Sequence, residues 1–231
     1  MRPFHFKNFS ILQDEKVFRV GTDAVLIGAL STIGNKKNVL EIGTGTGIIS
    51  LMIAQRNRNA KILGIDINEE ATKLSSLNFK NSIYAERLFA ENIDFNDLKS
   101  EKKFDLIICN PPYFEISSQS NKDAVARQKI HLNFSQLIVN TAFNLDIKGL
   151  FSVIIPVENN LEFVEIANEN SLYLSSKIVI FGRENLKPKR VILEFKKEKT
   201  STEVSEFIIE NGPRRFSDHY LEITKDFHLF K

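Results

Sequence analysis

The stretch over residues 105–114, which reads DLIICNPPYF, has the residue types to do chemistry on a planar amino group. Its apolar residues run directly into an Asn-Pro-Pro-Tyr corner, a pattern typical of a buried strand that ends in a stiff, exposed turn. Each proline fixes its own φ and restricts the residue before it, so the asparagine amide and the nearby carbonyls are held in place. The candidate catalytic residues are Asn110, Pro111, Pro112 and Tyr113.

The chemistry that suits this corner is transfer of an electrophilic methyl group to an amino nitrogen. The lone pair of such a nitrogen is delocalised into a ring or a carbonyl, which makes it a poor nucleophile. Acceptors that hold both amino hydrogens favour the pyramidal geometry of the transition state. The Asn110 side-chain oxygen and the Pro111 carbonyl could be these acceptors, and Tyr113 could stack on a base at about 1–3 kcal/mol. The alternative is a proline-terminated strand followed by an ordinary surface turn.

Residues 38–66 predict a nucleotide-binding site. VLEI is a short apolar strand, GTGTG is a glycine loop and IISLMIAQR is a helix, and this order is typical of Rossmann-like folds. Glycines allow a ligand to approach the backbone closely. Residues 61–65 predict a second strand that ends at Asp66, about twenty residues after the glycines, where a carboxylate can bind a ribose diol. The glycines of the loop are Gly43, Gly45 and Gly47.

Glu41, at the end of the first of these strands, separates two classes of cofactor. A nicotinamide dinucleotide would use the same strand, glycine loop and ribose carboxylate. The Glu41 carboxylate, however, would repel a pyrophosphate and would attract the positively charged methionine portion of S-adenosylmethionine. Together with the Asn-Pro-Pro-Tyr corner, Glu41 favours S-adenosylmethionine as the cofactor and S-adenosylhomocysteine as the product.

These motifs resemble the amino-methyltransferase branch of the class I S-adenosylmethionine-dependent methyltransferases. Within that branch, the chain is similar to the bacterial tRNA (adenine-N6)-methyltransferases that modify valine tRNA beside the anticodon. The matching segments are FHFKNFSILQD, FRVGTDAVLIGA, VLEIGTGTGIISLMIAQR, GIDIN, DLIICNPPYF and HYLEITKDFHLF. They span nearly the whole chain. NPPY alone also occurs in rRNA guanine and protein glutamine methyltransferases, so the ordered set of motifs is more specific than any one of them.

The resemblance implies an α/β fold of the Rossmann-like class I methyltransferase type, with a seven-stranded, mostly parallel sheet that ends in a C-terminal antiparallel hairpin. It also implies methylation of the N6 amino group of an adenosine in tRNA, at adenosine 37 beside the anticodon of tRNA(Val). The alternatives are rRNA guanine-N2 methylation, protein glutamine N5-methylation and a non-catalytic RNA-binding role. The intact acceptor pair at Asn110 and Pro111 argues against the last of these, because a protein without catalysis does not need it.

The resemblance also assigns residues to the cofactor. In the family the GTDA corner lies near the cofactor, which makes Thr22 a candidate, with a helix N-cap as its alternative role. The family places an acidic residue and then an apolar one at the adenine, and here that position reads Asn92–Ile93, with Asp94 as the other option. The complete set of cofactor-binding candidates is Thr22, Glu41, Gly43, Gly45, Gly47, Asp66, Asn92, Ile93 and Asn110.

Two polar segments are candidates for contact with tRNA. Residues 115–133 follow the corner, are rich in serine and predict an active-site loop, with a solvated loop as the alternative. In this loop Arg127 and His131 stand where the family has Arg and His. The second segment, GRENLKPK, is a basic turn between two β-rich runs and could contact phosphates. Its candidates are Lys187, Lys189 and Arg190.

The remaining elements predict an alternation of strands and helices around these segments. Two consecutive strands without a helix between them predict the antiparallel hairpin. Residues 4–20 alternate in part between apolar and polar residues and predict short strands packed over the core. We expect one domain over residues 1–231, with an N-terminal β arm over 1–20 and a catalytic core over 21–231. The other expected elements are helices over 68–81, 134–145, 158–168 and 217–227 and strands over 87–91, 149–156, 172–181 and 190–195.

Composition limits the other possibilities. The chain has 231 residues, of which 42% are hydrophobic, so it can bury a sizeable core. Its net charge of +2 gives no overall attraction to nucleic acid, and phosphate binding must come from local patches.

The single cysteine, Cys109, is expected to be a buried hydrophobe. The four histidines are scattered, so we expect no metal. No apolar run approaches the roughly 20 residues that span a bilayer, and we expect a cytoplasmic protein without an obligatory protein partner.

Overall fold

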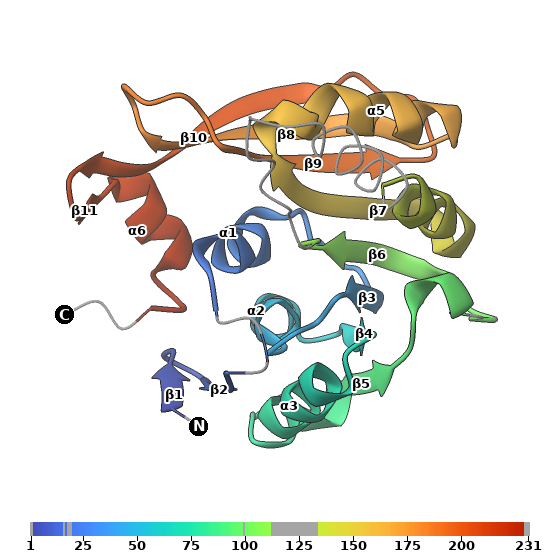
Figure 1. Ribbon diagram of the computed structural model, residues 1–231, viewed down its shortest axis with the longest axis vertical. Helices are drawn as coiled ribbons and strands as arrows, with labels where there is room; N and C mark the ends of the chain where they lie inside the picture. The colour runs from blue at the N-terminus through green and yellow to red at the C-terminus, as the bar shows by residue number, and fades with distance from the viewer. Residues whose placement is uncertain (1, 16, 18–19, 99, 112–133, 229–231) are drawn as a thin grey trace, which may run out of the picture.

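The computed structural model describes residues 2–15, 17, 20–98, 100–111 and 134–228. Its centre is a nine-stranded sheet in the order β11-β10-β8-β9-β7-β6-β3-β4-β5 (Figure 1). The strands are β3 (Asn38–Ile42), β4 (Lys61–Asp66), β5 (Leu88–Asn92), β6 (Phe104–Cys109), β7 (Leu145–Pro156), β8 (Tyr173–Arg183), β9 (Arg190–Lys196), β10 (Glu203–Gly212) and β11 (Arg215–Phe216). The helices are α1 (Thr22–Leu30), α2 (Ile48–Arg56), α3 (Glu69–Lys80), a helix over 134–144, α5 (Asn160–Glu169) and α6 (Asp218–Thr224).

The sheet has a parallel centre and a mixed end. Strands β5, β4, β3, β6 and β7 are parallel, β9 is antiparallel to both β7 and β8, and β10 is parallel to β8. The expected fold class, with antiparallel strands toward the C-terminus, is confirmed. The sheet is wider than the seven strands expected, because β10 and β11 extend it beyond β8. Phe207 is the one fully buried residue of β10, so this strand lacks the buried apolar run by which the other strands were predicted.

Two hydrophobic clusters cover the two faces of the sheet. Side chains alternate along β6, so that Leu106 and Ile108 belong to one cluster and Ile107 and Cys109 to the other. The first cluster contains α1, α2 and part of the N-terminal arm, and the second contains α5 and the helix over 134–144. Cys109 is buried as expected, and burial raises the pKa of its thiol. Within the described ranges, no helix is long and apolar enough to cross a membrane.

The N-terminal arm is a two-stranded hairpin of β1 (Arg2–His5) and β2 (Ser10–Gln13) that packs on the core. Phe6, Phe9 and Ile11 are buried, which confirms the expectation that these residues pack over the core rather than face solvent. The arm also contacts the other end of the chain: the Lys7 N–H donates to the Phe227 carbonyl at 2.8 Å.

The starts of two helices bear on the site. The Asn68 side chain accepts from the Glu70 N–H at 2.9 Å, which confirms it as the N-cap of α3. The N-cap of α1 is Gly21, with no side-chain cap, so Thr22 begins the helix and does not take the alternative role of capping it. Thr22 is exposed.

Candidate active site

The carboxyl ends of adjacent parallel strands bring the predicted site residues together. In the sheet register, Ile42 of β3 is opposite Ile65 of β4 and Cys109 of β6. Because neighbouring strands lie about 4.8 Å apart, the segments that follow these residues emerge side by side. They are the glycine loop, Asp66 and Asn110. Open α/β sheets bind ligands at this edge.

The three glycines of the loop serve two different purposes. All three have φ in the left-handed region, at +70° for Gly43, +53° for Gly45 and +81° for Gly47. A Cβ added at Gly43 would meet nothing within 4 Å, and one at Gly45 would meet only a carbonyl oxygen at 4.0 Å. A Cβ at Gly47 would lie 2.4 Å from Phe79 Cε1 on α3. Gly43 and Gly45 therefore face open space that a ligand could fill, whereas the packing of α3 explains Gly47.

Asp66 fixes the loop and still has capacity for a ligand. One carboxylate oxygen accepts from the Gly45 N–H at 2.9 Å and the other from the Asn68 N–H at 2.9 Å. The N–H groups of Gly43 and Thr44 both donate to the Ile65 carbonyl at 2.9 Å, which holds the loop against β4. An ionised carboxylate has about four acceptor sites, so lone pairs remain for the two hydroxyls of a ribose. This arrangement fits the predicted role of Asp66.

Glu41 lies beneath the same loop and is 1% exposed. Its Oε2 accepts from the Thr44 hydroxyl at 2.9 Å, from the Ser50 N–H at 3.0 Å and from the Ser50 hydroxyl. Its Oε1 has no hydrogen-bond partner among the described residues. Burial raises the pKa of Glu41 to about 7, although the hydrogen bonds from Ser50 and Thr44 act in the opposite direction. The unpartnered oxygen of a buried carboxyl group fits a site that receives a positively charged ligand group.

Asn78 on α3 is a structural part of the site that the sequence analysis missed. It is 1% exposed, and its amide donates to the Thr46 carbonyl in the glycine loop at 2.8 Å. The same side chain donates to the Leu12 carbonyl at 3.1 Å and accepts from the Leu12 N–H at 2.8 Å. Asn78 therefore joins β2 of the N-terminal arm to the glycine loop. The available signal was an amide next to Phe79 on an otherwise apolar helix face.

The rim beside Asp66 has the groups expected around an adenine. Asp66 is opposite Asn92 of β5 in the sheet register, and the Asn92 amide donates to the Asp66 carbonyl at 2.8 Å. Asp94 bonds within its own turn, where its Oδ1 accepts from the backbone and side-chain amides of Asn96, each at 2.9 Å. Of the two candidates, Asn92 is the one bonded directly to Asp66. Ile93 follows it and is half-buried.

Ile67 is a second residue that the sequence analysis missed. It directly follows Asp66 and is 73% exposed, which is unusual for a large aliphatic side chain in a structured turn. Because Asp66 and Asn92 are register partners, Ile67 and Ile93 follow on adjacent strand ends. Ile67 is open to solvent at the carboxyl edge and can meet a ligand there, whereas Ile93 packs in part against the second cluster. The signal in the sequence was an apolar residue immediately after the ribose carboxylate.

The catalytic corner begins where β6 ends. Asn110 and Pro111 are half-buried and follow Cys109 directly, beside the strand that carries the glycine loop. The sheet therefore places an amide oxygen and a proline carbonyl next to the predicted cofactor site. The other predicted residues on this side lie outside the described residues, and they are Pro112, Tyr113, Arg127 and His131.

The basic turn over residues 184–189, between β8 and β9, lies at the same edge of the sheet. The Val157 N–H, just after β7, donates to the Lys189 carbonyl at 3.2 Å. Lys187 and Lys189 are exposed. Arg190 differs from them, because its Nε donates to the Asp23 carboxylate at 2.8 Å and the pair joins the start of β9 to the start of α1. Arg190 thus has a role within the fold in addition to the RNA contact predicted for it.

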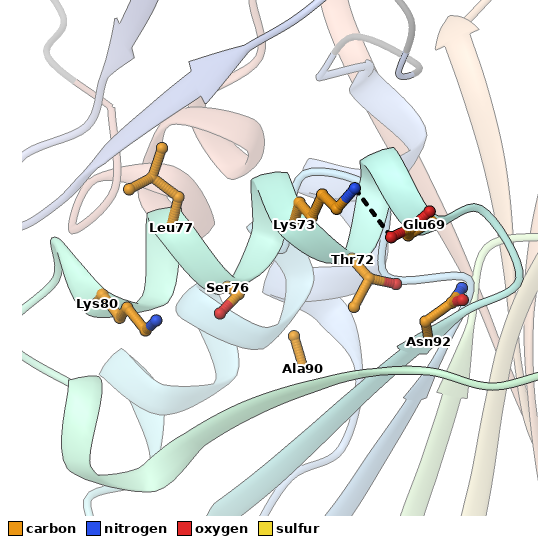
Figure 2. Close-up of a pocket in the computed structure, with 8 residues that line it drawn as sticks. All are labelled: Glu69, Thr72, Lys73, Ser76, Leu77, Lys80, Ala90 and Asn92. Carbon is orange, nitrogen blue, oxygen red and sulfur yellow. Dashed lines mark ion pairs between the residues drawn. The ribbon is translucent and has the colours of Figure 1, made fainter.

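An open groove of about 490 Å³ lies away from this corner, between α3 and the edge strand β5 (Figure 2). Figure 2 shows Thr72, Ser76 and Ala90 facing it, with Lys73 paired to Glu69 at 2.9 Å. Of the predicted site residues, only Asn92 lines it. No group of His, Cys, Asp or Glu among the described residues could hold a metal ion.

The strand order, with the glycine loop and Asp66 at the carboxyl edge, is that of the Rossmann-like class I methyltransferase fold. Solved structures share the fold. A predicted O-methyltransferase from Agrobacterium tumefaciens superposes with a TM-score of 0.70 over 89% of this chain and 96% of its own, at 16% identity. A methyltransferase from Pyrococcus furiosus gives 0.62 over 83% and 90%, at 23% identity.

Comparison with sequence families is more specific. The profile of the family described as "Methyltransferase small domain" matches residues 11–143. The tRNA1(Val) (adenine(37)-N6)-methyltransferase of Flavobacteriaceae bacterium (strain 3519-10) is 47% identical over 100% of both chains. The protein of the same name from Phocaeicola vulgatus is 37% identical over 98% of this chain and 97% of its own. The chain belongs to the tRNA1(Val) (adenine(37)-N6)-methyltransferase family, which confirms the resemblance seen in its motifs.

Proposed function

We propose that the protein transfers a methyl group from S-adenosylmethionine to the exocyclic N6 amino group of adenosine 37 in tRNA1(Val). The observation that carries the proposal is the position of the Asn110–Pro111 corner. The register of Ile42 with Cys109 puts this corner beside the glycine loop, in a chain 47% identical to a relative with that name. Since the substrate is a tRNA, we place the reaction in the cytoplasm.

The cofactor-binding groups divide the ligand among them. Asp66 accepts the ribose hydroxyls, Gly43 and Gly45 allow the ligand to lie against the backbone, and Asn92 offers its side-chain oxygen to the adenine amino group. Glu41 supplies negative charge below the loop. When bound, S-adenosylmethionine provides the electrophilic methyl group that the chemistry requires.

The catalytic corner acts on the target amino group. The Asn110 side-chain oxygen and the Pro111 carbonyl accept its two hydrogens, which draws the nitrogen lone pair out of the ring and aims it at the methyl group. Because the two acceptors stabilise the positive charge that develops on the nitrogen, no strong general base is needed in the transition state. After methyl transfer, the nitrogen releases one of these two protons to water, because an amide oxygen accepts a hydrogen bond but is too weak a base to keep the proton.

The substrate must present its base outside a stack. Extruding a base costs a few kcal/mol and is easiest in a single-stranded loop, so an anticodon loop is a better substrate than a duplex. The net charge of only +2 means that local cations must bind the phosphates, and the turn with Lys187 and Lys189 lies at the same edge as Asn110.

Nucleoside mass spectrometry tests the reaction and its substrate together. Unmodified tRNA1(Val), incubated with the protein and S-adenosylmethionine, should yield N6-methyladenosine. The same transcript with guanosine at position 37 should remain unmodified, because the amino group of guanine sits elsewhere on the ring. Equal methylation of the guanosine transcript, or methylation of ribosomal RNA alone, would transfer the proposal to one of the alternative substrates.

A substitution at the corner tests the chemistry separately from binding. Asn110→Ala should reduce turnover by about 10²-fold or more while the dissociation constant for the cofactor changes little. The matched control is Asn35→Ala, an exposed turn asparagine between α1 and β3 at the opposite edge of the sheet. If Asn110→Ala methylates tRNA at the wild-type rate, the corner is structural and the mechanism is wrong.

A further inference from the structure

β10, one of the two strands that widen the sheet, ends at the same edge as the catalytic corner, and β11 begins there. β8 and β10 run in the same direction as β6 and β7, so Gly212 at the end of β10 and Asn110 after β6 both lie at the carboxyl edge. In Figure 1 the β10–β11 hairpin, in red, lies on the left, the side toward which the arrow of β6 points. Four strand spacings separate β6 from β10, which corresponds to roughly 20 Å.

The tip of this hairpin contains an arginine in a conformation that favours glycine. Pro213 and Arg214 form the turn between β10 and β11, and Arg214 has φ of +60°. The other non-glycine residue with positive φ among those described is Ser171, which directly follows the end of α5, where this conformation is common. Arg214 lacks that explanation. A glycine at position 214 would adopt this backbone conformation without strain. Because the fold would be served better by glycine there, we attribute the arginine to a function of its side chain.

The charge at the tip is exposed and uncompensated. Arg214 and Arg215 are exposed, and within the described part of the chain neither guanidinium has an ion-pair partner. On the neighbouring strand β8, Arg183 is paired with Glu210 of β10 at 3.2 Å. The acidic residues nearest to Arg214 along the chain are Glu210, which is the residue paired with Arg183, and Asp218 at the start of α6. With Lys187 and Lys189 on the neighbouring turn, this edge of the sheet carries a positive excess.

The hairpin is held in place from behind. The Phe216 ring stacks on Tyr220 of α6 at 4.5 Å and 18°. The Ser217 N–H donates to the Ile209 carbonyl at 2.9 Å, and the Ser217 hydroxyl donates to the Ile208 carbonyl at 2.6 Å. The two arginines therefore project from a fixed support, which lowers the conformational entropy lost when they bind a ligand.

We propose that the β10–β11 hairpin binds backbone phosphates of the tRNA stem that adjoins the methylated loop, through Arg214 and Arg215. This proposal rests on the proposed function. The separation of roughly 20 Å from the catalytic corner is too large for the loop nucleotide itself and suits the adjoining helix. Arginine is the side chain that recognises phosphate in a bidentate way. Phosphate contacts of this kind position an RNA without reading its sequence.

Arg214→Gly is the sharpest test, because it removes the charge and relieves the backbone strain together. The variant should unfold at the wild-type temperature or above it, so weaker binding cannot be attributed to misfolding. Its affinity for the complete tRNA should fall about three- to tenfold, and the slope of log K against log salt should become shallower by about 0.7–0.9. Arg214→Lys should keep the wild-type slope. The matched control is Arg58→Gly, at an exposed turn on the opposite edge of the sheet. It should change neither the affinity for tRNA nor the salt slope.

Substrate variants separate this inference from the proposed function. A stemless oligonucleotide with the loop sequence should bind wild type and Arg214→Gly equally. If Arg214→Gly weakens the stemless and the complete RNA alike, or lowers affinity without changing the salt slope, the hairpin does not hold stem phosphates. If wild type methylates tRNA1(Val) and Arg214→Gly binds it as wild type does, the inference fails and the proposed function stands. If wild type does not methylate tRNA, the proposed function fails first.

Discussion

The two sides of the glycine loop differ in what they contact. Below it, Glu41, Gly47 and Asn78 are buried and bonded or packed within the protein. Above it, Gly43 meets open space and Ile67 is largely exposed. A single motif thus contains some residues that hold the loop and others that face a ligand. Substitutions of Gly47 and Asn78 should act on folding stability, substitutions above the loop should act on cofactor affinity, and substitutions of Glu41 should act on both.

Two glycine substitutions should test the difference between the two sides of the loop most directly. Gly47→Ala places a methyl group 2.4 Å from Phe79 and imposes a left-handed alanine, so it should lower the free energy of unfolding by about 2–4 kcal/mol. Gly43→Ala has only the conformational cost of about 1–2 kcal/mol, but it should weaken cofactor binding at least ~10-fold by occupying the open side. Urea unfolding and calorimetry measure the two effects. If Gly43→Ala loses as much stability as Gly47→Ala and keeps its affinity for the cofactor, the distinction between the two glycines is refuted.

Glu41 should make stability depend on pH. Burial raises its pKa from 4.5 to about 7, so the folded protein binds this proton more tightly than the unfolded chain. The resulting stability is fully present below pH 4.5 and is lost as pH rises through about 7, which amounts to roughly 3 kcal/mol at 1.36 kcal/mol per pKa unit. Glu41→Gln cannot titrate and should lack this loss. Urea unfolding between pH 4.5 and 8 gives the free energy of unfolding of wild type and of Glu41→Gln. The difference between these two free energies should become smaller, or change sign, toward pH 8.

The cofactor provides a second measurement on Glu41. A cationic ligand group near the loop favours the ionised carboxylate, so S-adenosylmethionine should stabilise wild type more at pH 8 than at pH 5. In Glu41→Gln this stabilisation should be smaller and nearly independent of pH. The same pH dependence in both proteins would remove Glu41 from the cofactor site and leave it as a support of the loop.

Asp66→Ala should weaken S-adenosylmethionine binding by about 1.5–3 kcal/mol, because the charge-assisted hydrogen bonds to the ribose are lost. Asp66→Asn is the control that keeps an acceptor for the Gly45 N–H but loses the charge. Its affinity for S-adenosylmethionine should lie between those of wild type and Asp66→Ala. Isothermal calorimetry measures both, together with NAD, for which no binding is expected. Unchanged affinity in Asp66→Ala would place the ribose elsewhere.

Ile67→Ala should give the smallest effect, a loss of about 1 kcal/mol in cofactor affinity through reduced apolar contact with the adenine. Because the side chain is 73% exposed, the free energy of unfolding should hardly change. Ile83→Ala is a matched control, since Ile83 is 79% exposed and lies after the end of α3, away from the carboxyl edge. Equal affinities for the two variants would show that Ile67 is an ordinary surface residue.

The sequence predicted the centre of the fold well because its strands are buried on both faces. Strands β3, β4 and β6 read as short apolar runs, which is the pattern expected of a parallel sheet covered on both sides. β10 has a single fully buried residue, Phe207, and its backbone pairing with β8 creates the strand. Propensity and pattern do not report such pairing, which depends on the rest of the sheet.

The candidate site could be predicted where a residue type has one chemical use. Asp66 and Asn110 are examples, since a carboxylate after the second strand and an Asn-Pro corner both indicate a ligand. Asn78 was not assigned, and Gly47 was assigned to the cofactor rather than to the packing of α3, because both roles arise from contacts between segments distant in the sequence. For the same reason, the charge of Glu41 could be predicted but its burial could not.

The contact between Lys7 and Phe227 has a consequence for how the protein is made. The first strands of the chain emerge from the ribosome long before residue 227, so this hydrogen bond cannot form until residue 227 has emerged as well. The hydrogen bonds of Asn78 to Leu12 and Thr46 join residues that are made much earlier, so the arm can meet the glycine loop before its contact with Phe227 forms. A ribosome-bound chain that stops before α6 should therefore carry the glycine loop and the catalytic corner, while its N-terminal arm still lacks the contact with Phe227.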